Sequence, residues 1–187
     1  YYSNNSLSGR SSFQLSEYDL AEIGRVEDVE SFARQSFDKK VALMFKEGWD
    51  FVGKNPKTIK YVRTRMAQIS QASNTPIDAL FRNVGSSLIR KSNCFLFKVR
   101  NIEASGGRVR SEKGKITPLL PVAAYFVIPA ETVEYKVAGN RVSRWRQRMP
   151  DGTHKEYGVK DIVHFFLDKK EGLVFGTPSK NVQISLF

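Results

Sequence analysis

The sequence predicts an α+β fold, in which amphipathic helices precede a mostly antiparallel sheet. Three observations lead to this class. Apolar residues recur at helical spacing between Val26 and Lys91, short segments rich in Val, Tyr and Phe follow Pro118, and turn sequences separate those segments. With 187 residues, of which 41% are hydrophobic, the chain is long enough to bury a core.

The first part of the chain predicts an arm and a helix. Residues 1–25 are rich in Ser, Asn and Gly and then acidic, so we expect an extended N-terminal arm. The apolar spacing that starts at Val26 predicts a long amphipathic helix over residues 26–47, which Gly48 stops.

Two further helices are predicted by their start signals. Asn55 followed by Pro56 combines an N-cap with a proline at the first helical position, so we expect a helix over 56–72. Thr75 and Pro76 repeat the signal and predict a helix that ends near Lys91.

Short β-type segments make up the second half of the chain. A continuous apolar run predicts a first strand that is buried on both faces, and a long Gly-rich basic loop over 102–117 follows it. The turn sequences AGN and PDG predict antiparallel hairpins among the later strands. The expected strands are 93–101, 124–128, 132–137, 141–148, 154–159 and 161–166.

The net charge of +11 is unevenly distributed along the chain. Up to Asp50 there are 6 Lys and Arg against 9 Asp and Glu, which gives −3; beyond it there are 24 against 10, which gives +14. A basic body favours a polyanion or an acidic protein surface as a partner. The plainer interpretation is solubility together with neutralisation by neighbours in an assembly, and charge alone does not choose between these.

Few residues are available for metal, redox or triad chemistry. The single cysteine, Cys94, excludes an internal disulfide and lies in an apolar run, which is typical of a buried and inert thiol. There are two histidines, His154 and His164, and no CxxC, HExxH, GxxxxGK[ST] or GxGxxG motif. The sequence contains no run of eighteen apolar residues, so it predicts no membrane-spanning helix.

Three arginines in the segment RWRQR are candidate contacts for nucleic acid or for another subunit. Arg144, Arg146 and Arg148 fall on one face of the expected strand, with Trp145 and Gln147 on the other. Such a row suits phosphates or a carboxylate-lined partner. The alternative is an exposed edge strand whose charges prevent aggregation.

Two more basic segments are candidates of the same kind. The loop over 102–117 carries Arg108, Arg110, Lys113 and Lys115, which suit a phosphate backbone, although a disordered loop explains them equally. In the expected helix over 56–72, the basic residues lie away from the apolar stripe, which is typical of a solvated helix face.

His164 is predicted to be an architectural residue. On a strand it shares a face with Ile162 and Phe166, and no second ligand is near it in sequence, so a core histidine bonded to the backbone is expected. Gly176 then allows the chain to reverse, and Thr177 and Pro178 open a fourth helix.

The order of these motifs resembles that of the tailed-bacteriophage portal proteins. A helix leads into a buried strand, a proline-flanked strand follows, and a D-I-x-H segment precedes a glycine turn and a helix start. The matching residues are Leu120, Pro121, Ile128, Pro129, Asp161, Ile162, His164, Gly172, Gly176, Thr177 and Pro178. The sequence departs from the pattern in three places: Asn93-Cys94 replaces a Gly-Asn pair, the basic loop is longer, and threonine replaces a serine.

The resemblance implies a structural subunit of a ring, usually of twelve copies, at one vertex of a capsid. It further implies a channel for DNA packaging and ejection, contacts with the major capsid protein, the terminase, a head–tail connector protein and double-stranded DNA, and no enzymatic activity, cofactor or metal. Residues 26–187 would form the wing region, continuing into the stem, clip and crown. Such a protein occurs in the virion, and in the host cytoplasm during assembly.

Two other functions remain open at this point. A stand-alone module that binds nucleic acid without sequence preference would explain the basic body. A small hydrolase or transferase would use Asp161, His164 or His154.

Overall fold

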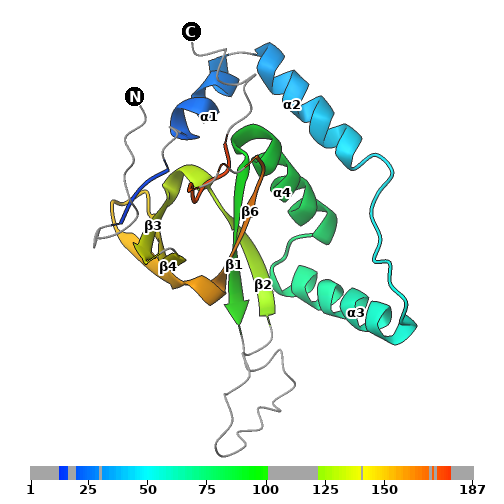
Figure 1. Ribbon diagram of the computed structural model, residues 1–187. Coiled ribbons are helices and arrows are strands. Elements are labelled where there is room, and N and C mark those ends of the chain that lie inside the picture. Colours follow the sequence, from blue (N-terminus) through cyan, green and yellow to red (C-terminus); the bar gives the residue numbers. More distant parts are fainter. Residues whose placement is uncertain are drawn as a thin grey trace, which may run out of the picture.

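The computed structural model describes residues 13–16, 20–29, 31–100, 122–139, 141–168, 170 and 172–177. Helices lie along one side of two three-stranded antiparallel sheets (Figure 1). The fold is therefore α+β, as the sequence predicts. Within the described residues, no helix is long and apolar enough to cross a membrane.

Two helices, α1 (Leu20–Val29) and α2 (Ser31–Met44), replace the single long helix expected over 26–47. The prediction of an extended arm up to residue 25 is wrong for its last residues, because α1 already begins at Leu20. Leu20 and Ile23 are three residues apart and both are buried, so they extend the helical apolar spacing towards the N-terminus. The helix α2 ends at Met44, four residues before Gly48, and residues 45–47 form a turn.

The start of α3 (Pro56–Ala72) follows the capping prediction. The side chain of Asn55 accepts hydrogen bonds from the backbone N–H groups of Lys57 (2.9 Å) and Thr58 (3.4 Å), and Pro56 opens the helix. The predicted cap at Thr75 is wrong. The helix α4 (Ile77–Lys91) has no side-chain cap, because the Thr75 hydroxyl is hydrogen-bonded to the Ser73 carbonyl at 3.1 Å instead.

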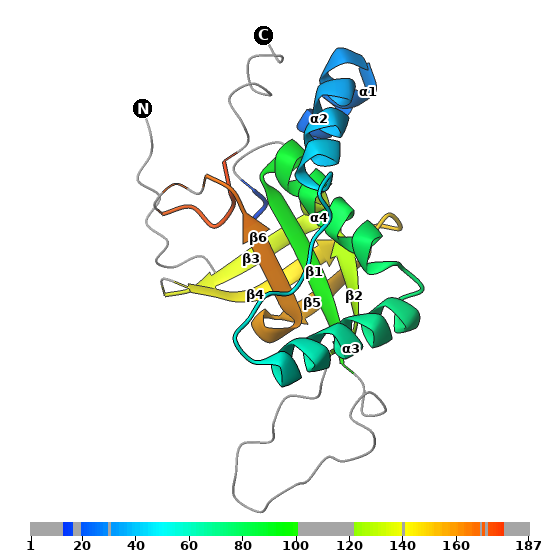
Figure 2. The same ribbon diagram turned by 90° about the vertical axis from the view of Figure 1, so that its right-hand side faces the viewer.

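The first sheet has the strand order β2-β1-β6. Its central strand is β1 (Asn93–Arg100), which pairs with β2 (Val122–Ile128) and with β6 (Ile162–Phe166). The first four residues of β1 are buried, as expected of a strand covered on both faces. In the view of Figure 2, α3 and α4 lie in front of this sheet.

The second sheet has the strand order β3-β4-β5 and lies behind the first (Figure 2). It contains β3 (Val133–Ala138), β4 (Arg141–Arg148) and β5 (His154–Gly158). Short 3-10 turns, Ala130–Thr132 and Val159–Asp161, connect the two sheets. The β4–β5 turn places Gly152 at a φ of 80°, a conformation that glycine adopts without strain.

The main hydrophobic core lies between the two sheets. The Phe95 ring of β1 is 5.2 Å from the Trp145 ring of β4, and the Phe97 ring is 4.8 Å from the Tyr157 ring of β5. A smaller cluster lies on the other face of β1, where Cys94 and Leu96 pack against Leu80 of α4. The strand β1 therefore contributes side chains to both the core between the sheets and the cluster against α4.

Candidate functional site

The arginines of RWRQR lie on the outer face of the second sheet. Trp145 is buried in the core, while Arg144 and Arg148 are exposed, as the alternation predicts. The alternative interpretation as an edge strand is wrong, because β4 lies between β3 and β5 and pairs with both.

Only part of the arginine row is available to a partner. Arg146 forms an ion pair with the buried carboxylate of Glu134, and its guanidinium lies 4.1 Å from the centre of the Phe13 ring. Arg144 forms a looser, exposed ion pair with Glu156 at 3.4 Å. Arg148 is exposed and forms no ion pair with the residues that the structure describes.

Residues before α1 contribute to this face of the molecule. Gln14 forms an isolated antiparallel bridge with Tyr135 on the edge of β3, with two backbone hydrogen bonds of 2.8 Å. Phe13 thereby lies over Arg146. This stretch of the predicted arm is extended, and it covers the Arg146–Glu134 ion pair.

Arg108, Arg110, Lys113 and Lys115 lie outside the described residues, as do Pro178 and the helix expected after it.

The helix α3 presents a second basic surface. Its apolar stripe faces the first sheet, with Ile69 buried, while Lys57, Lys60 and Tyr61 are exposed. Arg65 turns inward and donates a hydrogen bond to the Val122 carbonyl of β2 at 2.8 Å.

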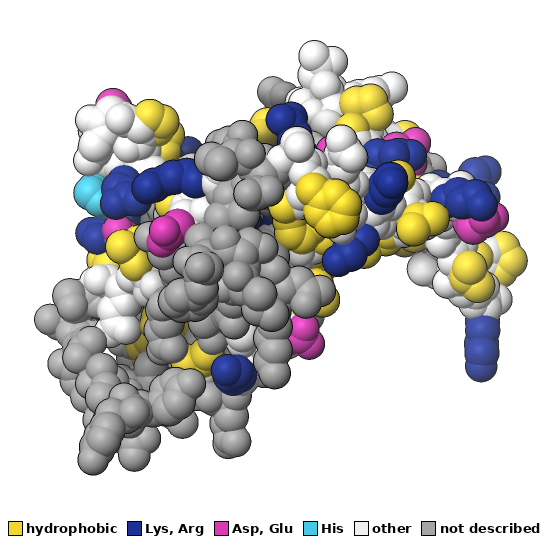
Figure 3. Space-filling view, turned by 90° about the horizontal axis from the view of Figure 1, so that it is seen from above, with side chains coloured by type: hydrophobic (Ala, Val, Ile, Leu, Met, Phe, Trp, Pro, Cys, Tyr) yellow, Lys and Arg dark blue, Asp and Glu magenta, His cyan; other side chains and the backbone are white. Residues whose placement is uncertain are grey.

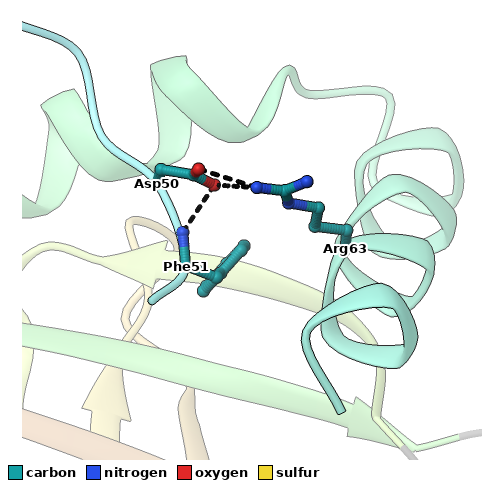
Figure 4. Close-up of polar contacts among 3 residues, drawn as sticks. All are labelled: Asp50, Phe51 and Arg63. Carbon is teal, nitrogen blue, oxygen red and sulfur yellow. Dashed lines mark hydrogen bonds and ion pairs between the residues drawn. The ribbon is translucent and has the colours of Figure 1, made fainter. Parts of the chain in front are cut away.

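A connecting segment, residues 45–55, holds α3 against α4. Asp50 accepts hydrogen bonds of 2.7 Å from the Arg63 guanidinium and from the backbone N–H of Phe51 (Figure 4). The Arg63 hydrogen bond, and then the Phe51 N–H, hold the pKa of the Asp50 carboxyl below its usual value. Trp49 donates a hydrogen bond to Asp78 at the start of α4 and packs edge-on against Phe81.

A buried junction joins β1, β6 and the segment that follows β6. The Asn93 side chain is fully buried, and its amide nitrogen donates to the carbonyls of Lys91 (2.9 Å) and Gly176 (3.0 Å). Its amide oxygen accepts the Gly176 N–H at 2.7 Å and lies 3.1 Å from Nε2 of His164. Because the two Gly176 bonds fix the orientation of the amide, Nε2 of His164 carries the hydrogen in this contact.

His164 is an architectural residue of this junction, although its partner differs from the prediction. Its ring stacks on Phe95, with 4.2 Å between ring centres, and contacts Trp145 edge-on. The expected backbone partner is wrong for Nε2, which bonds the Asn93 side chain instead. The other histidine, His154, lies exposed on β5 of the second sheet.

Gly176 is required by close packing rather than by a chain reversal. A Cβ at this position would lie 2.3 Å from the Ser92 carbonyl oxygen and 2.5 Å from that of Leu167. Its φ lies outside the left-handed region, so the predicted reason, a reversal that needs glycine, is wrong.

Asn93, the centre of this junction, is not among the site residues that the sequence predicts. The available signal was an asparagine next to a cysteine inside an apolar run, where a polar side chain needs hydrogen-bond partners. Those partners lie up to 83 positions away in the chain, so no local pattern indicates them.

The described residues contain no group of three or more His, Cys, Asp and Glu side chains that could hold a metal ion. Burial raises the pKa of the Cys94 thiol to about 11, so this cysteine is a poor nucleophile at neutral pH.

Several large apolar side chains remain on the surface. Phe32, Leu43 and Met44 are exposed on α2, with Phe32 81% exposed, and Phe165 and Phe166 are exposed at the end of β6. Seen from above the helical end of the molecule (Figure 3), hydrophobic side chains lie on the surface beside Lys and Arg.

The fold resembles that of a particle protein. A chain from the virion of a native gene transfer agent (GTA) particle superposes with a TM-score of 0.60 and 13% sequence identity. The match covers 95% of this chain and 42% of that chain, so the protein spans less than half of its structural neighbour. No protein-family model and no curated protein matches the sequence.

Proposed function

We propose that this protein is the wing region, residues 26–187, of a subunit of a ring-shaped portal, of the kind found in tailed bacteriophages and related particles. In this role, copies of the subunit form a ring, of twelve in the usual case, at one capsid vertex. The ring is the channel through which DNA is packaged and later ejected. It also provides the attachment point for the terminase and the tail connector.

The observation that carries this proposal is the fold likeness over 95% of the chain to a protein of a GTA virion. By itself, this structural similarity indicates a shared fold. The order of the sequence motifs, from the buried strand through Ile128 and Pro129 to the segment Asp161–Gly176, adds the resemblance to portal proteins. The two observations are independent, because the neighbour shares only 13% of its residues with this chain.

The surface chemistry supports a role within an assembly. Exposed apolar side chains on α2 and at the end of β6 suit a protein whose surface is partly covered by other chains. Exposed cations such as Arg148, Lys57 and Lys60 would be repeated around a ring, where they add up to a field that favours DNA or acidic neighbours. The major capsid protein is a further expected contact, in the virion and during assembly in the host cytoplasm.

The proposed role involves no bond-making chemistry. The His164 ring contacts the Asn93 amide and four aromatic rings, and His154 lies on the other sheet. We expect His164→Ala to lower stability. If that variant stayed as stable as the wild type while a hydrolytic or transfer activity of the protein disappeared, the enzyme alternative would replace this proposal.

Electron microscopy of the purified intact gene product tests the proposal. The expected result is closed rings of uniform copy number, with the residues described here in the outer part. A particle that remains a monomer at high concentration, in both low and physiological salt, would contradict it.

One alternative has support from a specific observation, the +14 charge of the chain beyond Asp50. A stand-alone module that binds nucleic acid without sequence preference would be a stable monomer, and its affinity for DNA would fall steeply with salt. Titration of duplexes of unrelated sequence, combined with the copy number from mass photometry, separates the two functions.

A further inference from the structure

The helix α3 presents one polar face to the surface. Its exposed positions recur at spacings of three and four residues, so they share one side of the helix, opposite the buried Ile69. Figure 2 shows α3 in front of the first sheet, against which Ile69 packs. The exposed set, here called the α3 outer face, consists of Lys57, Lys60, Tyr61, Thr64, Gln68 and Gln71.

The α3 outer face contains cations and no carboxylate. Residues 53–77 include no Asp or Glu. The carboxylates nearest in sequence, Asp50 and Asp78, are bonded to side chains outside this face. Among the residues that the structure describes, neither Lys57 nor Lys60 forms an ion pair. The positive charge of this face is therefore not neutralised by the described part of its own chain.

The lysines lie at the end of the helix where they contribute least to its stability. The N-terminus of a helix carries a partial positive charge, so acidic residues are stabilising there and cations are not. The helix α4 follows this rule, with Asp78 in its first turn and Arg90 and Lys91 in its last. The first turn of α3 has no acidic residue and contains Lys57. Helix stability does not explain these cations, and a bound anion would offset their cost.

The neutral side chains of this face are of the kinds that contact phosphates. Proteins hold a nucleic-acid backbone with Lys and Arg and also with Tyr, Thr, Asn and Gln side chains. Tyr61 is 64% exposed and carries a hydroxyl that can donate. The amide oxygen of Gln68 accepts a hydrogen bond of 2.6 Å from Arg65, so its N–H groups point away from that contact and can donate to an oxygen from outside. Thr64 donates to the Lys60 carbonyl at 2.9 Å and adds no further donor.

The same composition disfavours a protein or a single strand as the occupant. Lysine is depleted in the buried centres of protein–protein interfaces, where aromatic and apolar side chains are enriched. The α3 outer face has one aromatic residue, Tyr61, and no Leu, Ile, Met or Phe. One aromatic side chain also provides no platform on which successive bases of a single strand could stack. The backbone of a duplex, which needs cations and donors along a surface, fits best.

We propose that the α3 outer face binds the phosphate backbone of duplex DNA without sequence preference. The helix has 17 residues and is therefore about 25 Å long, enough to lie along several successive phosphates. This inference rests on the proposed function for the choice of DNA as the polyanion, and it names the surface of the subunit that DNA contacts.

Removal of two lysine charges from the intact chain tests the contact. Binding of a fluorescent duplex of mixed sequence is followed by anisotropy over a range of salt concentrations. Lys57→Gln with Lys60→Gln is expected to weaken binding about tenfold in ~0.1 M salt, because two phosphate contacts are lost. The slope of the logarithm of affinity against the logarithm of salt concentration is expected to fall by about 2. Lys57→Arg with Lys60→Arg keeps the charges and is expected to bind as the wild type does.

The matched control removes the same charge from another helix. Lys39 and Lys40 are exposed on α2, which lies at the other end of the helical side of the molecule (Figure 1). Lys39→Gln with Lys40→Gln is expected to change the affinity by less than about twofold in ~0.1 M salt, because distant charges are screened. Thermal melts exclude a structural cause. Since cations near a helix N-terminus are unfavourable, Lys57→Gln with Lys60→Gln is expected to melt at the wild-type temperature or above it.

The outcomes separate this inference from the proposed function. If the two pairs of substitutions lowered the affinity for DNA equally, or if neither did, the inference would be wrong, while rings seen by electron microscopy would leave the portal proposal standing. If Lys57→Gln with Lys60→Gln left DNA binding unchanged but prevented ring assembly, the occupant would be an acidic protein surface and the inference would again be wrong. A preference of about tenfold or more for one duplex sequence would indicate base recognition and would also overturn it. A monomer that loses DNA affinity through this pair of substitutions would support the contact and replace the portal proposal by the stand-alone module.

Discussion

Replacement of Asn93 by alanine is the most direct test of the buried junction. The substitution removes all four contacts of the amide, and it leaves the N–H and the C=O of the buried Gly176 without their partner. A buried polar group left unpaired costs about 1–3 kcal/mol, so these two groups together predict a loss of about 4 kcal/mol. The contacts to Lys91 and His164 add less, because both residues are only partly buried.

This loss is large compared with the whole stability of a domain, which is about 5–15 kcal/mol. In a chain of this size, 1 kcal/mol shifts the melting temperature by about 2–4 °C, so we expect Asn93→Ala to melt about 8–16 °C below the wild type. Urea unfolding followed by circular dichroism gives the free energy and shows whether the m-value is unchanged. Hydrogen exchange at the Gly176 amide reports whether the junction opens before the rest of the domain.

A matched control is available on the surface. Asn83 is exposed on α4, so Asn83→Ala removes the same amide from a solvated helix position and is expected to change stability by less than about 0.5 kcal/mol. A single unpaired buried group is expected to cost at least about 1 kcal/mol. If the free energy of unfolding of Asn93→Ala lay within about 1 kcal/mol of the wild-type value, with an unchanged m-value, the assignment of a hydrogen-bonded junction would be refuted.

Three further predictions concern single side chains. Gly176→Ala is expected to destabilise by about 2–3 kcal/mol through overpacking, whereas Gly53→Ala, where a Cβ meets only ordinary contacts, stays near neutral in thermal melts. Arg146→Ala is expected to lower stability by about 3 kcal/mol, because it leaves the buried Glu134 carboxylate without its ion-pair partner. Arg148→Ala is expected to leave stability unchanged and to lower the salt-dependent affinity for DNA. Since burial raises the pKa of Cys94 to about 11, a thiol reagent at pH 8 is expected to modify the unfolded chain but not the native one.

The sequence predicted the elements whose causes are local. The helix α3 begins and ends at the expected residues, because a capping asparagine and a proline act within a few positions. The strand β4 also has the expected bounds, because its alternation is complete within its own length. The predicted cap at Thr75 is wrong, although the sequence signal there, a capping residue followed by proline, is the same as at Asn55. Asn74 adopts a φ of 48°, and the preceding turn directs the Thr75 hydroxyl back to the Ser73 carbonyl.

The candidate site was less predictable, because its chemistry depends on distant partners. The composition of β4 indicates three equivalent arginines, but the register with β3 places Glu134 opposite Arg146 and the arm adds Phe13 over it. Arg146 therefore stabilises the fold, and Arg148 is left for a partner. The role of Asn93 depends in the same way on Gly176, which joins it only when the fold is complete.

These distant contacts also connect both ends of the described chain to the core. Near its start, the described chain is attached to the second sheet through the Gln14–Tyr135 bridge. Near its end, it is attached to the first sheet through the Asn93–Gly176 bonds. The aromatic core between the sheets joins these two attachments, and closely packed interiors transmit strain with little compression. A force applied at either attachment therefore reaches the other through the core rather than along a flexible connection, which suits a subunit whose proposed work is cohesion within a ring.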